Sequence, residues 1–135
     1  MRYPVTLEPD NGVYLVQFPD IPEALTQGGS REEALEMALD ALVTSFEFYF
    51  EDSEKVPAPS AVTGDYVEVP ASVTAKVIML NAFIDSGLTQ IQLANAMGVK
   101  KQEVTRLFDL QHSTKIDTIQ KALSALGKQL ELVAV

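Results

Sequence analysis

Residues 88–108, LTQIQLANAMGVKKQEVTRLF, predict two short amphipathic helices joined by a tight turn. With Gln90 as the first position of a helix-turn-helix, a small Ala94 falls at the fifth, where the two helices pack together. Gly98 then falls at the ninth, in the turn, where glycine adopts left-handed backbone without steric cost. Apolar Val104 falls at the fifteenth, under the second helix. The spacing therefore favours a helix-turn-helix over a helical hairpin in some other small bundle.

The second of these helices has a polar side with long reach, and this side suits the major groove of DNA. Lys and Arg can read guanine there, and Gln can read adenine. The simpler interpretation is a solvated helix face. The candidates for base contacts are Lys101, Gln102, Thr105 and Arg106. The candidates for phosphate contacts are Thr89, which is also the expected N-cap of the first helix, Gln90, Lys100 and Lys115.

The composition limits the class of protein. The chain of 135 residues has room for one domain or two small ones, and 47% hydrophobic residues suffice to bury a core. There is no cysteine, which excludes disulfides, thiolate zinc sites and a cysteine nucleophile. The N-terminal segment lacks the apolar region of a signal peptide, and no apolar run is long enough to span a membrane. We therefore expect a soluble, cytoplasmic protein.

Charge divides the chain into two modules. Residues 1–68 hold 14 acidic and three basic residues, a net charge of −11, whereas residues 69–135 hold five acidic and seven basic ones, a net charge of +2. The basic half can tolerate phosphates, and the acidic half should repel nucleic acid and attract a basic partner. We therefore predict an acidic domain over 1–69 and a DNA-binding domain over 70–135.

The N-terminal module is predicted to be a small α+β sheet crossed by one helix. Alternating and β-forming residues predict the strands, and an Asn-Gly pair predicts the turn of the first hairpin. Ser30 and Glu33 form an S-x-x-E capping box ahead of a wide apolar stripe, which predicts a long helix. The expected strands are 2–7, 13–18, a short one over 24–27, and 66–69.

The C-terminal module is predicted to be all-α except at its end. A support helix starting at Ser72 and a last helix over 115–126 should pack around the helix-turn-helix. Leu130, Leu132 and Val133 form a short apolar run for which we expect a strand. Such a strand either pairs with a second copy across a two-fold axis or covers the core of its own module.

Little in the sequence supports catalysis. His112 is the one histidine, and no second histidine or cysteine accompanies it to form a metal site. The ββ(β)αβ order resembles the start of the RNase H-like fold, whose nucleases hold metals on carboxylates that include one in the first strand. The middle of that strand carries none here. We therefore predict no enzyme activity, no cofactor and no bound metal.

Acidic side chains on the long helix expected in the N-terminal module, and in the loop that contains Asp20 and Glu23, have two interpretations. They form either a solvated charged face or a docking surface for a cationic partner. The candidate docking residues are Asp20, Glu23, Glu32, Glu36 and Asp40.

Several segments together resemble HicB antitoxins of the helix-turn-helix branch. In the N-terminal module they are MRYPVTLEP, FPDIPEALTQGGS, EEALEMALDALVTSFEFYFED and YVEVP, and in the C-terminal module the similarity runs over 88–133. The resemblance implies a bacterial type II antitoxin. Its partial RNase H-like domain would bind and silence a small HicA toxin, an mRNA-cleaving ribonuclease. Its helix-turn-helix would bind the promoter of its own operon and repress it.

The charge division agrees with this resemblance. An RNA-cleaving toxin must be basic to hold its substrate, and an acidic module would compete for that surface. A single helix-turn-helix buries little surface on DNA, so we expect a homodimer or larger oligomer, joined through the C-terminal module. The alternative function is a repressor that senses a small ligand and has no toxin partner.

Overall fold

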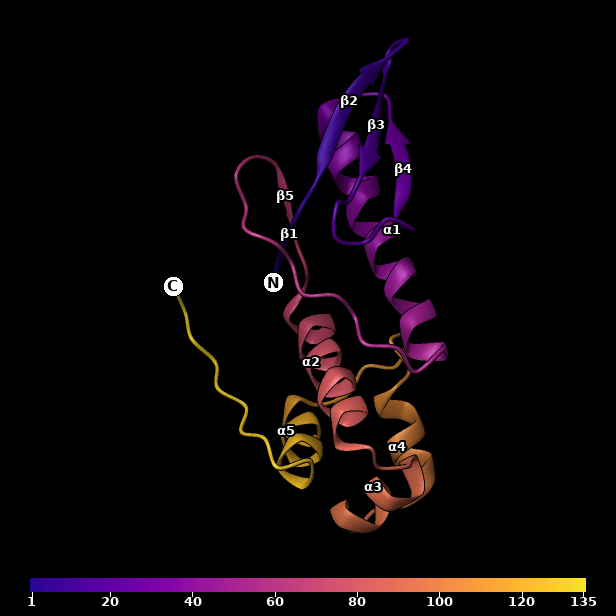
Figure 1. The fold of residues 1–135 in the computed structure, drawn as a ribbon, viewed down its shortest axis with the longest axis vertical. Helices are drawn as coiled ribbons and strands as arrows, with labels where there is room; N and C mark the ends of the chain where they lie inside the picture. Colours follow the sequence, from indigo (N-terminus) through magenta and orange to yellow (C-terminus); the bar gives the residue numbers. More distant parts are fainter. The chain divides into compact units, whose positions relative to one another are not determined.

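The computed structural model describes residues 1–135 and divides into two compact units (Figure 1). The first unit contains Met1–Tyr49 and Val56–Ala71, and the second contains Phe50–Lys55 and Ser72–Val135. All strands belong to the first unit, and the second is helical. The expected mixed architecture, with strands first and a helical helix-turn-helix after them, is confirmed. None of the helices combines the length and the apolar character needed to cross a bilayer.

The elements follow one another in the order β-β-β-β-α-β-α-α-α-α. Their bounds are β1 Arg2–Pro4, β2 Thr6–Asp10, β3 Val13–Gln17, β4 Leu25–Gly28, α1 Arg31–Glu51, β5 Tyr66–Glu68, α2 Ala71–Ser86, α3 Gln90–Met97, α4 Lys101–Leu107 and α5 Ile116–Ala125.

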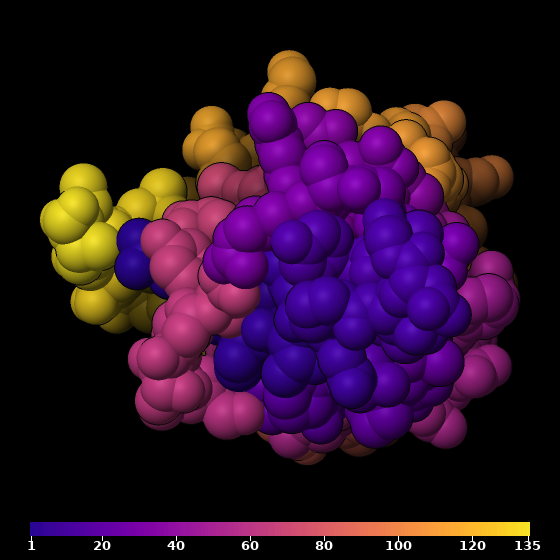
Figure 2. All heavy atoms as spheres, turned by 90° about the horizontal axis from the view of Figure 1, so that it is seen from above, coloured from indigo at the N-terminus to yellow at the C-terminus, as the bar shows by residue number.

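Two small antiparallel sheets form the β-structure of the first unit. One has the order β2-β3-β4, and the other pairs β1 with β5. The predicted hairpin turn between β2 and β3 is confirmed, because Asn11 and Gly12 both have left-handed φ values, 50° and 85°. In Figure 2 most atoms from the start of the chain, in indigo, gather on one face beside purple atoms of the same unit.

The prediction of a single strand over 2–7 is wrong. Val5 separates β1 from β2, and its N–H donates to the carbonyl oxygen of Asp65 over 3.0 Å. Pro4 has no N–H to donate, so the ladder is weakened where β1 ends. The break allows β1 to pair with β5 while β2 pairs with β3. Tyr3 and Val5 both remain buried, as their alternation predicts.

Helix α1 begins at the predicted cap, with one difference. The Ser30 hydroxyl accepts a hydrogen bond from the Glu33 N–H over 3.1 Å. The Glu33 carboxylate accepts from the N–H of Gly29 over 3.3 Å, one residue before the expected partner. The predicted apolar stripe packs into the unit, where Phe46 contacts Tyr3 with ring centroids 5.6 Å apart. Its fully buried members are Ala34, Ala38, Leu42 and Phe46.

Gly28 allows α1 to approach the sheet closely. A Cβ added there would lie 2.6 Å from the Cα of Ala34, inside van der Waals distance. We expect Gly28→Ala to destabilise the first unit by about 1–3 kcal/mol, because helix backbone must shift to relieve the overlap. Gly64→Ala is the matched control, since a Cβ at Gly64 meets nothing within 4 Å. Chemical denaturation of the two variants tests this, and equal unfolding midpoints would contradict it.

The second unit has one hydrophobic core built by all four of its helices, with Leu130 packed against its edge. Within the single chain the expected C-terminal strand does not form, because 128–135 contains neither helix nor strand. A strand needs a ladder partner, and the helices of this unit offer none. Leu132 and Val133 are each 78% exposed. The core residues are Ala75, Met79, Ala82, Phe83, Leu93, Ala94, Met97, Val104, Leu107, Ile119, Ala122 and Leu123.

Candidate DNA-binding surface

A complete capping box begins the first helix of the helix-turn-helix. The Thr89 hydroxyl accepts from the Gln92 N–H over 3.1 Å, and the Gln92 side chain accepts from the Thr89 N–H over 2.9 Å. Thr89 was predicted as the N-cap, but its partner Gln92 was missed. The signal was present, since T-x-x-Q is a form of the capping-box pattern. The box orients the start of α3, where Thr89 is exposed and Gln90 is half-buried.

The turn between α3 and α4 has the geometry that Gly98 predicts. Gly98 has a φ of 70°, which is left-handed, and it ends α3. Its N–H donates to the carbonyl of Asn95 over 3.2 Å, and the N–H of Val99 donates to that of Ala94 over 3.0 Å. These bonds satisfy carbonyls at the helix end. Ala94 is 3% exposed, so a small residue sits where the two helices pack.

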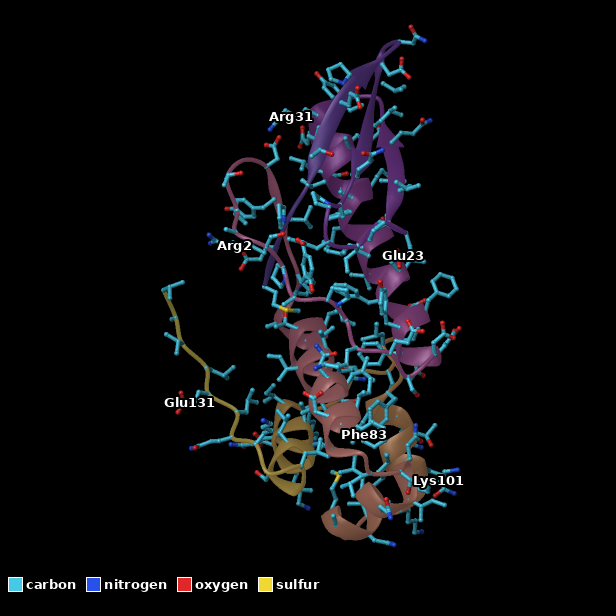
Figure 3. All side chains as sticks on the ribbon, viewed as in Figure 1. Arg2, Glu23, Arg31, Phe83, Lys101 and Glu131 are labelled. Atoms are coloured by element: carbon cyan, nitrogen blue, oxygen red, sulfur yellow. The ribbon has the colours of Figure 1, made fainter.

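Helix α4 buries one side and exposes the other. Val104 and Leu107 are fully buried against the core of the second unit. The four predicted base-reading residues are all exposed, and Figure 3 shows Lys101 projecting outwards from the helix. The Thr105 hydroxyl donates to the carbonyl of Lys101 over 3.2 Å, so this shorter side chain is partly engaged within the helix. Lys101, Gln102 and Arg106 make no such bond.

Lys100 and Lys115 lie at the starts of two helices of the second unit. Each is the N-cap residue of its helix, α4 and α5 respectively, and neither side chain bonds back to the cap. Both side chains are exposed. Their ammonium groups are therefore free to reach phosphates, and the contacts themselves stay a prediction.

Sequence analysis missed a buried lysine beneath the surface. Lys76 on α2 is 4% exposed, and its Nζ donates to three carbonyl oxygens. The acceptors are Arg106 at 3.2 Å, Asp109 at 2.7 Å and His112 at 2.6 Å. Lys76 thus joins α2 to the end of α4 and to the loop after it. The available signal was a charged residue among the apolar positions of α2, three residues after Val73.

Burial lowers the pKa of Lys76 from its ordinary value of 10.5, because the charged form loses hydration, while the nearby Asp109 opposes the shift. A positive charge beside the last carbonyls of a helix is also favourable for the helix dipole. The ammonium supplies one proton for each of three acceptors. The neutral amine would have only two to donate.

The candidate docking residues of the first unit differ in their surroundings. Both oxygens of Asp20 accept hydrogen bonds from Ser60, one from its N–H over 2.9 Å and one from its hydroxyl. Glu23 accepts from the Tyr49 hydroxyl over 2.8 Å. The remaining three are exposed on α1 and form no ion pair; they are Glu32, Glu36 and Asp40.

Together, a helix-turn-helix with an exposed polar recognition helix and an acidic α+β unit define a two-module DNA-binding protein. Two family models match the chain, and each covers one of the modules. Residues 2–78 match the HicB-like antitoxin of bacterial toxin–antitoxin systems, and residues 82–133 match the helix-turn-helix. The chain belongs to the HicB-like antitoxin family. The resemblance seen in the sequence is thereby confirmed.

Curated relatives agree over nearly the whole chain. Antitoxin HicB 1 of Photorhabdus laumondii is 74% identical over 133 residues, which are 98% of this chain and 86% of that protein. Antitoxin HicB of Escherichia coli strain K12 is 57% identical over 138 residues and 100% of each chain. Antitoxin HicB of Pseudomonas fluorescens is 32% identical over 134 residues, 97% of this chain and 92% of that one. The family is one of antitoxins with a DNA-binding domain and not of enzymes.

Proposed function

We propose that the protein binds and neutralises a small basic HicA-like toxin that cleaves mRNA, and that it represses its own operon by binding operator DNA. The observation that carries the proposal is the union of an acidic N-terminal half, −11 over 1–68, with a helix-turn-helix whose recognition helix is exposed and basic. The first module, 1–69, binds the toxin, and the second, 70–135, binds the DNA. The toxin and the operator are both cytoplasmic targets, so the proposed site of action is the cytoplasm.

The proposed toxin-binding module is a partial RNase H-like domain. Its order of four strands, one helix and a fifth strand supports this assignment. The proposed contact surface contains Asp20, Glu23, Glu32, Glu36 and Asp40. Among these, Asp20 already accepts two hydrogen bonds from Ser60, so its first role is to hold two loops of the unit together.

Charge reversal on α1 tests the toxin-binding half of the proposal. The triple variant Glu32→Lys, Glu36→Lys, Asp40→Lys should slow association with the toxin about tenfold or more at low salt, since it inverts the field that steers a basic partner. The salt dependence of the association rate should also weaken. Stopped-flow or biosensor measurements of the association rate at several salt concentrations check both.

A control with the same change in net charge separates steering from total charge. It reverses acidic residues away from the proposed surface, and it should associate at close to the wild-type rate. Neutralisation of the toxin by residues 70–135 alone would contradict the division of labour. The control residues are Glu54, Asp117 and Glu131, all exposed.

The DNA-binding half of the proposal predicts two kinds of effect on DNA affinity. Arg106→Ala and Gln102→Ala should each cost about 1–3 kcal/mol at the operator and leave non-specific binding nearly unchanged, because these side chains can pair bidentately with guanine and adenine. Lys100→Ala and Lys115→Ala should weaken binding to all sequences alike, and each should reduce the salt slope by about one unit, because phosphate contacts release counterions.

Fluorescence titrations of operator and unrelated duplexes over a range of salt concentrations distinguish these effects. All four variants should still bind the toxin, since the changes are on the surface of the other module. If Arg106→Ala binds the operator with wild-type affinity at every salt concentration, the proposed base readout is wrong. Operator affinity that responds to a small ligand, without any toxin partner, would favour the alternative of a ligand-sensing repressor.

A further inference from the structure

A groove lies between the edge strand β4 and helix α1 of the first unit. Its volume is about 280 Å³. One wall is the segment from Glu23 to Thr26, and the other comes from α1 between Met37 and Phe48. In the sheet order β2-β3-β4, strand β4 is at the edge, so no further strand covers this side. Figure 3 shows Glu23 beside α1.

Large apolar side chains line this groove and are unusually exposed. Leu25 is 63% exposed, Phe48 60% and Met37 40%. Leu25 also lines a second hollow, of about 330 Å³, on the side of Thr6 and Gln17. Exposed apolar side chains gathered on one surface indicate a contact with a partner.

The groove also contains two carboxylates, and their chemistry points to the occupant. Glu23 is oriented by the Tyr49 hydroxyl, which donates to its Oε1 over 2.8 Å and leaves Oε2 without a hydrogen bond. Asp40 lines the groove and forms no ion pair. Asp20, by contrast, is outside the groove and is engaged by Ser60 at both oxygens. An apolar floor with acids at its rim matches a long side chain that is aliphatic along its stem and cationic at its end.

We propose that this groove receives a single lysine or arginine side chain of the toxin. The stem lies on Leu25, Met37 and Phe48, the cationic end pairs with Asp40 and Glu23, and the ring of Phe48 adds a cation–π contact. The inference rests on the proposed function, because it assumes a basic toxin partner. The net charge of −11 over 1–68 supplies the complementarity.

The test compares Asp40→Asn with Asp10→Asn in the full chain, with the HicA-like toxin of the operon as the probe. Both residues are exposed in the first unit, and both changes remove one charge, but only Asp40 lines the groove. Asp40→Asn should raise the Kd about tenfold through faster dissociation, because a partly buried pair is lost. Asp10→Asn should change the Kd about twofold or less, as expected for an exposed charge outside the contact.

Phe48→Ala tests the apolar floor, with Val62→Ala as its control. Val62 is 38% exposed in the same unit but lies outside the groove. Phe48→Ala should raise the Kd for the toxin about tenfold, and Val62→Ala should leave it near the wild-type value. The double variant Asp40→Asn, Phe48→Ala should lose less than the two single effects combined, because one toxin side chain makes both contacts. Circular dichroism spectra matching wild type verify that the exposed changes leave the fold intact.

The possible outcomes separate the groove from the proposed function. Wild-type protein that fails to bind the toxin overturns both. Wild-type protein that binds, while Asp40→Asn and Asp10→Asn behave alike, overturns the groove only. Additive effects of Asp40→Asn and Phe48→Ala also overturn a shared side chain. A change in self-association in Phe48→Ala, seen by sedimentation, would mean that the occupant is a second copy of this chain and would overturn the proposal.

Discussion

Lys76→Met is expected to lower the free energy of unfolding of the second unit by about 1–3 kcal/mol. Methionine fills a similar volume but donates no hydrogen bond, so the carbonyls of Arg106, Asp109 and His112 all lose the Nζ donor. The Arg106 and Asp109 carbonyls keep backbone N–H donors, from Asp109 and His112 respectively, so the largest cost falls on the His112 carbonyl. A buried acceptor left without a donor costs about 1–3 kcal/mol. Urea denaturation followed by helical circular dichroism measures the loss.

Lys121→Met is the matched control, because Lys121 is an exposed lysine of the same unit on α5. It should change the free energy of unfolding little, as surface substitutions usually do. Lys76→Met should also weaken operator binding, although Lys76 is too buried to contact DNA, because the end of α4 and the following loop lose their support. If the two variants have equal free energies of unfolding, the hydrogen bonds of the Lys76 ammonium do not stabilise the unit, and only its aliphatic stem does.

The lowered pKa of Lys76 gives this prediction a pH signature. The folded-state pKa lies below the unfolded value, so the unfolded chain binds more protons in the interval between them. The contribution of Lys76 to the free energy of unfolding therefore rises with pH over that interval, which ends near 10.5. The difference in stability between wild type and Lys76→Met should increase in the same direction, and unfolding curves at a series of alkaline pH values check the sign.

Leu132→Asp combined with Val133→Asp is expected to convert a dimer into a monomer and to weaken operator binding about 10²–10⁴-fold, because two linked half-site contacts become one. Both side chains are 78% exposed on an extended terminal segment, on which Figure 3 also labels Glu131. We propose that these residues pair with a second copy across a two-fold axis. Leu130, the third residue predicted for this contact, packs on the core of its own unit.

Val135→Asp is the control for the dimer. It adds a charge to the same segment at the chain end, beyond the proposed contact, and should leave the sedimentation behaviour unchanged. Analytical ultracentrifugation and operator titration of the same samples test the link between self-association and affinity. A wild-type chain that sediments as a monomer at micromolar concentration would count against the proposal.

The helix-turn-helix could be predicted from sequence because its signals act over a few residues. Gly98 and the apolar period around it determine the turn, and the Thr89 cap needs only Gln92, three residues away. The Asn-Gly turn of the first hairpin is local in the same sense. The candidate DNA-binding residues follow directly, since helical period decides which side chains of α4 are left exposed once Val104 and Leu107 are buried.

The features that the sequence did not reveal depend on residues far apart in the chain. The division of 2–7 into two strands follows from pairing of β1 with β5, more than 60 residues later, as Arg2 opposite Glu68 illustrates. Lys76 is an unexpected charge in an apolar helix until the carbonyls of Arg106, Asp109 and His112 are placed around it.

The sequence by itself therefore determined the order of the modules, the recognition helix and the charge of each half. Periodicity, caps and turn residues act between residues that are close along the chain. Only the tertiary structure decided that Gly28 must lack a Cβ, that 128–135 forms no strand within its own unit, and that β4 and α1 leave an acidic, apolar groove. Close approach, ladder partners and exposure belong to surfaces that meet in space. No pattern along the chain encodes them until those surfaces are packed.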